Sequence, residues 1–332
     1  MSEGALGRRQ LLAALLATSA CGGSRPLPAS PPPPEPLVLD PAVDLLPAPG
    51  LVWLVDARLR ELFATPALAA ALALLLAPTR LDAFAKYHGG VDLRSVSELA
   101  VASYGDSTVS VARVVLDPKR VESAFVSRAV AIEGRAEEGS VVRTWGSVGA
   151  SRQQLAILGR EALVLEQGAF GHLRAAELFA RGRLKRAFPA LLVEPLARVA
   201  QLLGDAPLRA FAPGPFEGEL GEGLGGLLAG ATAVGGAALP REHDPDGALA
   251  LRFIVTGAWG SDAGEAAKRL KASFDVLGND PLGRLMGVDR PLEGPVAYGE
   301  AEALHLEVTV DALGVATGLR DATGATIEEV MK

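Results

Sequence analysis

The chain of 332 residues contains a single cysteine, Cys21, and only four histidines. A lone cysteine cannot form a disulfide within the chain, and it cannot complete a zinc site of the Cys₂His₂ or Cys₄ type. The sequence also lacks a G-x-S-x-G segment, the commonest signature of serine hydrolases. The residue types that carry most metal and nucleophilic chemistry are therefore scarce, and the sequence predicts no cofactor and no metal site.

Basic residues are also fewer than acidic ones. The net charge is -7 at pH 7, and removal of residues 1–21 leaves 30 basic and 38 acidic residues, a net charge of -8. Nucleic acids and anionic lipid surfaces need a basic footprint, so neither is an expected partner. Hydrophobic residues make up 49% of the chain, enough to build the core of one large domain or two small ones.

What the sequence does have is a leader at its N-terminus. Arg8 and Arg9 precede the apolar run Leu11 to Ala17, and small residues lead to Cys21. This is the order of a secretory signal. Leu11 to Ala20 is too short to span a bilayer, which needs about 20 residues. We therefore expect a signal peptide at 1–21 and no membrane-spanning helix in it.

The leader resembles a bacterial lipoprotein signal, in which the cysteine is acylated and becomes the first mature residue. Thr18 stands where such signals prefer Leu, a tolerated departure. The resemblance implies lipidation of Cys21, with palmitate among the acyl chains. Several acyl chains would hold the mature protein on a membrane, because each buried methylene contributes about 0.8 kcal/mol. An idle cysteine in an ordinary leader is the alternative.

Two details of the leader bear on export and location. Arg8 and Arg9 followed by Gln10 resemble a twin-arginine signal, and they equally fit a plain basic segment of the general secretory route. Gly22 follows the cysteine, where an Asp implies retention in the inner membrane of such bacteria. The resemblance therefore favours the outer membrane.

A proline-rich segment, 22–37, follows the cysteine and includes four consecutive prolines at 31–34. Such a segment favours extended polyproline II structure, and we expect a disordered tether that holds a folded domain away from the membrane. Recognition of this segment by a partner domain is the alternative.

The remainder predicts an α+β fold in two similar halves, 38–200 and 201–332. In the first half, strands are expected at 51–56, 97–104, 108–116, 140–147, 153–158 and 161–166, with helices at 66–86, from 117 and at 169–181. Thr65 is the expected N-cap of the helix at 66–86. In the second half, strands are expected at 208–211, 230–239, 249–255, 295–299 and 303–310, with helices starting at 261–262 and 311.

The two halves read as an internal repeat. Residues 161–166 (EALVLE) match 302–307 (EALHLE), and an apolar helix is expected after each. The number of residues between the preceding helix and this motif is larger in the first half, which predicts about one extra strand there. Antiparallel sheets with helices on one face satisfy this pattern, either as ferredoxin-like units or as two packed half-barrels. Coincidence in a chain rich in Ala and Leu is the alternative.

Two local motifs are rejected as sites. Residues 221–226 fit G-x-G-x-x-G, but they follow a loop where a dinucleotide site requires a strand, and Glu222 would repel a phosphate. His243 lies among acidic neighbours at 242, 244 and 246, without the later Glu of a calcium loop. An exposed turn is the better interpretation.

The remaining polar and aromatic candidates favour structural roles. His88, His172 and His305 show no ligand spacing, and His305 alternates with Leu304 and Leu306 in a strand. Trp53, Trp145 and Trp259 fall in or beside strands, where packing is the default and sugar stacking the alternative. Catalytic carboxylate pairs cannot be recognised from sequence. We therefore predict no catalytic residue.

Leader, cysteine, tether and duplicated α+β domain together resemble uncharacterised lipoproteins of the Gram-negative envelope, a group with no known activity. The expected function is that of a non-enzymatic binding or structural module, anchored by Cys21. Its expected ligand is a protein, a glycan or an apolar molecule, bound in a cleft between the halves. A carboxylate-dependent envelope hydrolase is the alternative, and it would require two buried acids facing each other with perturbed pKa values.

Overall fold

The computed structural model describes residues 36–39, 41–184, 188–241, 247–285 and 287–330. The contacts within the chain divide it between residues 35 and 36, and the fold below is that of the second unit. The predictions for the signal peptide, for Cys21, for most of the tether and for His243 with its acidic neighbours lie outside the described residues.

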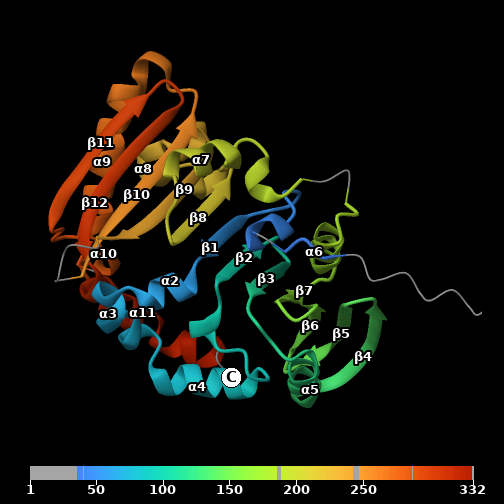
Figure 1. The fold of residues 1–332 in the computed structure, drawn as a ribbon. Helices are drawn as coiled ribbons and strands as arrows, with labels where there is room; N and C mark the ends of the chain where they lie inside the picture. The colour runs from blue at the N-terminus through green and yellow to red at the C-terminus, as the bar shows by residue number, and fades with distance from the viewer. Residues whose placement is uncertain (1–35, 40, 185–187, 242–246, 286, 331–332) are drawn as a thin grey trace, which may run out of the picture. The chain divides into compact units, whose positions relative to one another are not determined.

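Twelve antiparallel strands form one sheet among the described residues (Figure 1). The strands of the first half are β1 (Trp53–Ala57), β2 (Glu98–Ser103), β3 (Ser107–Arg113), β4 (Ala129–Glu138), β5 (Val141–Val148), β6 (Ser151–Leu158) and β7 (Ala162–Gly168). Those of the second are β8 (Leu208–Pro213), β9 (Ala231–Pro240), β10 (Ala248–Gly257), β11 (Glu293–Glu300) and β12 (Ala303–Asp311). The predicted α+β class is confirmed.

Helices join the strands. The α-helices are α2 (Leu59–Ala64), α3 (Ala69–Leu75), α4 (Pro78–Tyr87), α5 (Pro118–Arg128), α6 (His172–Ala180), α7 (Leu196–Leu203), α8 (Gly223–Gly226), α9 (Ala263–Asn279), α10 (Pro281–Leu285) and α11 (Ala312–Val330). Short 3₁₀ turns are η1 (Ala42–Leu45), η2 (Pro66–Leu68), η3 (Leu93–Ser95), η4 (Ala190–Leu192), η5 (Gly218–Leu220), η6 (Leu228–Gly230) and η7 (Gly260–Asp262).

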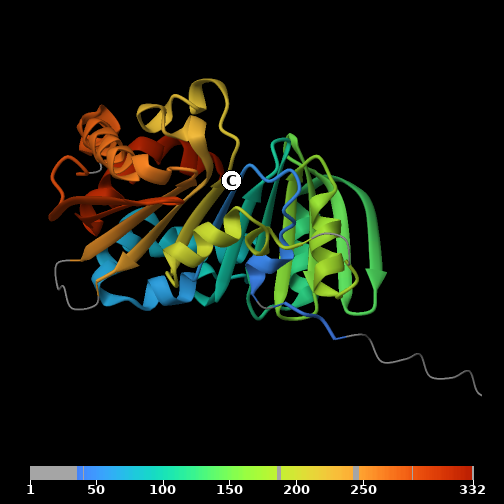
Figure 2. The same ribbon diagram turned by 90° about the horizontal axis from the view of Figure 1, so that it is seen from above.

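The order of the strands shows the two halves to be alike. β1 pairs with β8 at the centre of the sheet, and the order outward is β2, β3, β7, β6 on one side and β9, β10, β12, β11 on the other. Each half thus repeats the same path, and Figure 2 shows the two groups of strands on either side of β1. The first half adds the β4–β5 hairpin at its edge, so it has two extra strands where the spacing predicted about one.

The predicted helix at 66–86 is wrong in detail, because proline divides it. α3 ends at Leu75, and α4 begins at Pro78 after a bend of 67°. Proline lacks the N–H that would continue the helix, and it disfavours helical backbone at the residue before it. Thr65 is not a side-chain cap either, since its hydroxyl donates to the Glu61 carbonyl at 2.9 Å.

Other helix starts give a mixed result. The Asp117 carboxylate accepts the N–H groups of Lys119 and Arg120, and that of Asp311 accepts from Leu313 and Gly314, as predicted. Asp262 makes no capping hydrogen bond to α9 through its side chain. Strand β4 was not predicted, because this edge strand is largely exposed on both faces and has no apolar alternation.

Strand pairing shows which side chains share a face of the sheet. Val55 pairs with Val101 of β2 and with Ala210 of β8, and the rows continue outward to Leu165 of β7 and Phe253 of β10. Paired residues point to the same side. α5 and α9 pack on this side of the two halves, which we call the α9 face, and α6 and α7 pack on the other. The expectation of helices on one face is therefore wrong, because both faces of the sheet carry apolar side chains that helices cover.

The two faces are filled differently. On the α9 face of the first half, Phe125 of α5 is fully buried among side chains from β3 and β6. On the opposite face, α7 lies so close to β9 that a Cβ on Gly235 would come within 2.4 Å of Val199. Glycine is therefore required at 235 by this close approach. The α9 face of the second half is packed less completely. An open space remains there between the side chains of the sheet and those of α9.

Candidate ligand cavity

A row of paired residues crosses the α9 face of the second half. Along this row the side chains change from small on β8 and β9 to large on β10 and β12. The row runs through Val55, Ala210, Gly236, Phe253 and Leu306. In the neighbouring row that also lines the cavity, Ala212 of β8 and Val234 of β9 precede Val255 of β10 and Leu304 of β12. The sheet surface is therefore hollowed above β8 and β9.

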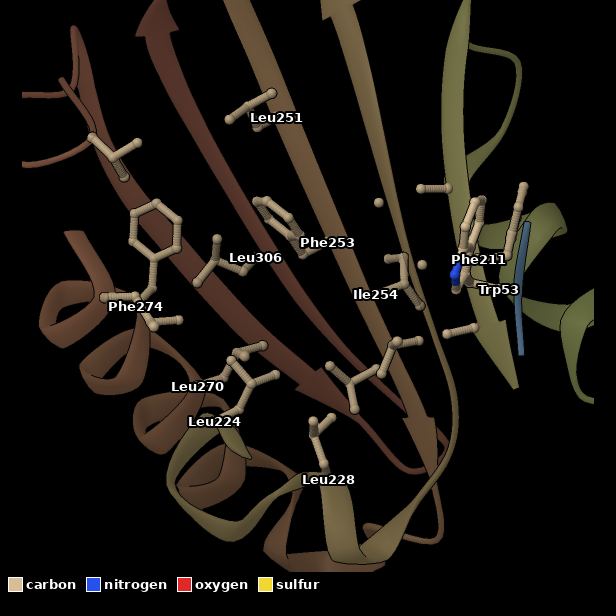
Figure 3. A pocket seen from close by; sticks show the side chains of 18 of the residues that line it. Trp53, Phe211, Leu224, Leu228, Leu251, Phe253, Ile254, Leu270, Phe274 and Leu306 are labelled. Atoms are coloured by element: carbon tan, nitrogen blue, oxygen red, sulfur yellow. The ribbon is translucent and has the colours of Figure 1, made fainter. Parts of the chain in front are cut away.

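Helix α9 forms the opposite wall of this hollow. Ala266, Ala267 and Leu270 form an apolar stripe on this helix and are buried against the sheet. Farther along the helix, Phe274 and Leu277 line an open space. Figure 3 shows Leu270 and Phe274 facing the side chains of Phe253 and Leu306 across it.

One end of the space is closed by the glycine-rich stretch before β9. Leu224 and Leu228 line the space and lie beside Leu270 in Figure 3. Leu224 has a φ of 52°, and Gly225 and Gly226 also have positive φ. A left-handed conformation is uncommon for leucine, and such strain tends to gather where a ligand is held. The Arg269 guanidinium donates to the Gly225 carbonyl at 2.5 Å, which ties the stretch to α9.

The result is a cavity of about 810 Å³. Its lining is almost wholly hydrocarbon, and Phe253, Leu251 and Val234 are only half-buried because they face it. At its rim, Leu277 is 49% exposed and Trp53 is 40% exposed. Such volume and lining are those of a site for a small apolar molecule.

Asp280 is the single ionisable residue among the described residues of the lining. It directly follows α9, and its Oδ1 accepts the N–H of Gly283 at 2.6 Å. The cavity therefore has one charged group among its described lining residues, at the C-terminal end of α9, whereas the stretch with Leu224 contacts the middle of α9 at Arg269.

The cavity differs from the cleft expected between the two halves. β1 and β8, which join the halves, supply one side through residues such as Trp53 and Phe211. Most of the lining, however, belongs to the second half. The sequence signals for it were the alternation of apolar residues in β10 and the small residues of β8 and β9, which we had interpreted only as strands.

The rejected G-x-G-x-x-G motif remains without support as a dinucleotide site. Residues 221–226 follow η5 and include α8, with no strand directly before them. Within this motif, Leu224 lines the cavity.

The described histidines are dispersed, and among the described residues no group of three metal-ligating side chains occurs. His88 stacks on Phe84, and burial followed by the charge of Arg128 lowers the pKa of His88 to about 4. His305 stacks on Tyr298, and burial is the main cause that lowers the pKa of His305. Both rings act as packing groups.

His172 lies in the one arrangement that resembles a catalytic triad. Its Nδ1 is 3.1 Å from the hydroxyl of Ser107 and 3.5 Å from a carboxylate oxygen of Glu166. A working triad needs the serine and the acid on opposite ring nitrogens, and here both approach the same one. The Glu166 carboxylate is instead occupied by the backbone N–H groups that begin α6. We interpret the group as structural.

The acid pair that the hydrolase alternative requires has one partial match. Burial, followed by the charge of Asp56, raises the pKa of Asp44. Asp56 itself pairs with the Arg209 guanidinium at 2.6 Å. Neither carboxylate is among the described residues that line the cavity. This geometry favours ion pairing over acid–base catalysis.

Packing accounts for two of the three tryptophans. The Trp259 indole donates to the Val255 carbonyl at 3.2 Å, and the Trp145 ring lies where a Cβ on Gly134 would collide with it. Trp53, at the rim of the cavity, is the exception. Sugar stacking on Trp145 or Trp259 therefore has no geometric support.

No single described helix has the length and apolar character needed to cross a bilayer. One bent pair, Pro66–Leu75 with Pro78–Tyr87, passes the same criteria of length and composition when taken together.

Comparison with known proteins yields fold-level likeness. No family model matches the sequence, and no curated protein matches it either. Crystal form I of TP0453, a Treponema protein, is 10% identical with a TM-score of 0.49, over 86% of this chain and 98% of that one. Crystal form IV of the same protein is 9% identical with a TM-score of 0.48, over 83% and 94%. A likeness of this strength says nothing about the ligand or activity of this chain.

Proposed function

We propose that this chain is a lipid-anchored protein of the bacterial envelope that binds an apolar ligand in the cavity beneath α9. The cavity carries the proposal, because about 810 Å³ lies within the range of roughly 300–1,000 Å³ typical of ligand sites. The described lining residues offer no set of polar groups for a sugar or a nucleotide. An acyl chain fits this lining best.

The expected affinity follows from the burial of methylenes. Each methylene contributes about 0.8 kcal/mol, and a single fourteen-carbon chain partitions into a bilayer with a constant of about 10⁴ M⁻¹. The apolar side chains of a preformed cavity should solvate an acyl chain at least as well as lipid tails do. Because these side chains are already in place, the entropy lost on binding comes mainly from the ligand. We expect dissociation constants below about 100 µM.

Binding of N-phenyl-1-naphthylamine, an uncharged probe that fluoresces in apolar surroundings, tests this function. The mature domain should bind it saturably at one site, and medium-chain amphiphiles should displace it. Extraction of protein purified from membranes should also release a stoichiometric apolar molecule. Probe fluorescence that never saturates, together with an empty extract, would refute the proposed function.

The anchor is tested separately by Cys21→Ala. We expect wild-type protein to carry a lipid-sized increase in intact mass and to sediment with membranes. The Cys21→Ala variant should lose both, because the thiol is the acylation site. Ser24→Ala, three residues away in the tether, is the matched control and should keep both. An unmodified, soluble wild type would remove the anchor while leaving the ligand site untouched.

A further inference from the structure

We infer that Asp280 determines which amphiphiles the cavity accepts: those with an uncharged or cationic head group that donates hydrogen bonds, and not those with an anionic head. This rests on the proposed function of the same cavity. It adds the chemical class of the ligand and the residue that sets it.

The position of Asp280 makes the two ends of the cavity chemically different. At about 1.5 Å per residue, Asp280 lies roughly 15 Å along α9 from Leu270, and Leu270 stands beside Leu224 and Leu228 (Figure 3). That end is hydrocarbon. At the other end, Leu277 is 49% exposed, so the carboxylate is near the water-facing rim. An amphiphile would place its chain toward Leu224 and its head beside Asp280.

The carboxylate has capacity for a ligand. Its Oδ1 accepts the N–H of Gly283 at 2.6 Å, and no hydrogen bond to Oδ2 occurs among the described residues. An ionised carboxylate only accepts hydrogen bonds. Hydroxyl and ammonium heads donate to it, whereas an ionised carboxylate or a phosphodiester head has no donor.

No cation offsets this preference within the described lining. Lys, Arg and His are absent from the described residues that face the cavity. Arg284 on α10 is exposed and outside the lining, and Arg269 is engaged with the Gly225 carbonyl. An anionic head would therefore meet a like charge in partly apolar surroundings, where charges need a partner.

The test is displacement of N-phenyl-1-naphthylamine from the mature protein by three ligands of equal chain length: monolauroylglycerol, dodecylamine and dodecanoate. We expect dodecanoate to bind at least tenfold more weakly than the other two. In Asp280→Asn this difference should shrink to less than about threefold. Asparagine keeps an acceptor for the Gly283 N–H, so the start of α10 is retained.

Asp275→Asn is the matched control, because it removes the same charge from an exposed residue that pairs with Lys271 outside the cavity. It should leave the tenfold difference intact. Asp280→Ser, another capping residue, replaces Asp280→Asn if that variant melts early. Equal displacement by all three ligands in wild type, or an undiminished difference in the Asp280 variants, overturns the inference while the proposed function stands. Failure of the probe itself to bind refutes the function instead.

Discussion

Gly236→Leu is expected to weaken binding of N-phenyl-1-naphthylamine about a hundredfold. Gly236 lies in the floor of the cavity, and a Cβ there would meet the Phe253 ring at 3.5 Å, an ordinary contact. A leucine side chain therefore enters the cavity without moving the backbone. It displaces about four ligand carbons, and at about 0.8 kcal/mol each the loss is roughly 3 kcal/mol.

The variant should stay folded, because it adds apolar volume to an empty space. Its thermal midpoint is expected to equal or slightly exceed that of wild type, since leucine also suits a strand better than glycine. Titration fluorescence and a thermal melt measure the two properties together. Ala258→Leu, which adds three carbons at an exposed residue after β10 and outside the lining, is the control and should bind the probe as wild type does. Unchanged affinity in folded Gly236→Leu would place the ligand elsewhere.

Glu166→Ala is expected to lower the free energy of unfolding by about 2–4 kcal/mol, because it removes a helix cap and leaves several backbone N–H groups without partners. The Glu166 side chain is fully buried. It accepts hydrogen bonds from the backbone N–H groups of Gly171, His172 and Leu173 at 2.9–3.3 Å. These are donors that a helix start leaves without partners inside the helix, and the positive end of α6 stabilises the carboxylate. Alanine would leave all three without this partner, and the Leu173 N–H would be unsatisfied in a buried position.

Urea unfolding measures this loss, with Glu137→Ala as the control. Glu137 is exposed, and its ion pair with Arg135 lies at the surface, so its removal should cost less than about 0.5 kcal/mol. Glu166→Gln should fall between wild type and alanine, because the amide keeps one acceptor and turns a donor toward the N–H groups. A loss below about 1 kcal/mol in Glu166→Ala would mean that the carboxylate does not hold α6 in place.

The same experiment bears on the group formed by Ser107, His172 and Glu166. Ser107→Ala removes only the hydroxyl beside His172 and should cost far less stability than Glu166→Ala. A structural role for Glu166 predicts this inequality, because its carboxylate is bonded to backbone, not to the ring alone.

Local signals in the sequence predicted most of the sheet. Alternating or continuous apolar runs located β1 to β3, β5 to β7 and β8 to β12 within a few residues, and turn residues such as Gly105 separated the hairpins. Asp117 marked the start of α5 because its carboxylate bonds to nearby N–H groups, an interaction complete within a few residues. The similarity of 161–166 to 302–307 also led to the repeat, whose equivalent strands β7 and β12 occupy matching places in the sheet.

Where the prediction went wrong, the deciding contacts were distant in sequence or the signal was weak. β4 has little apolar alternation, because it lies at the edge of the sheet and is largely exposed. The segment after Pro66 has an apolar composition throughout, which hid the bend before Pro78. Thr65 is a residue type common at N-caps, but its hydroxyl donates a hydrogen bond to the Glu61 carbonyl in the preceding turn.

The sequence by itself determined the α+β class of the fold and the likeness of its two halves, and it predicts a lipid anchor at Cys21, since each depends on local pattern or neighbouring residues. Only the tertiary structure decided that there is a cavity and where it lies. A hollow arises when small residues from β8 and β9 meet large ones from β10, β12 and α9, and those elements are far apart in the chain. The empty volume belongs to no segment, so no window of sequence carries a signal for it. Asp280 shows the same division: in sequence it is an acidic residue before a proline, and only the packing of α9 over the sheet places it in an otherwise apolar lining.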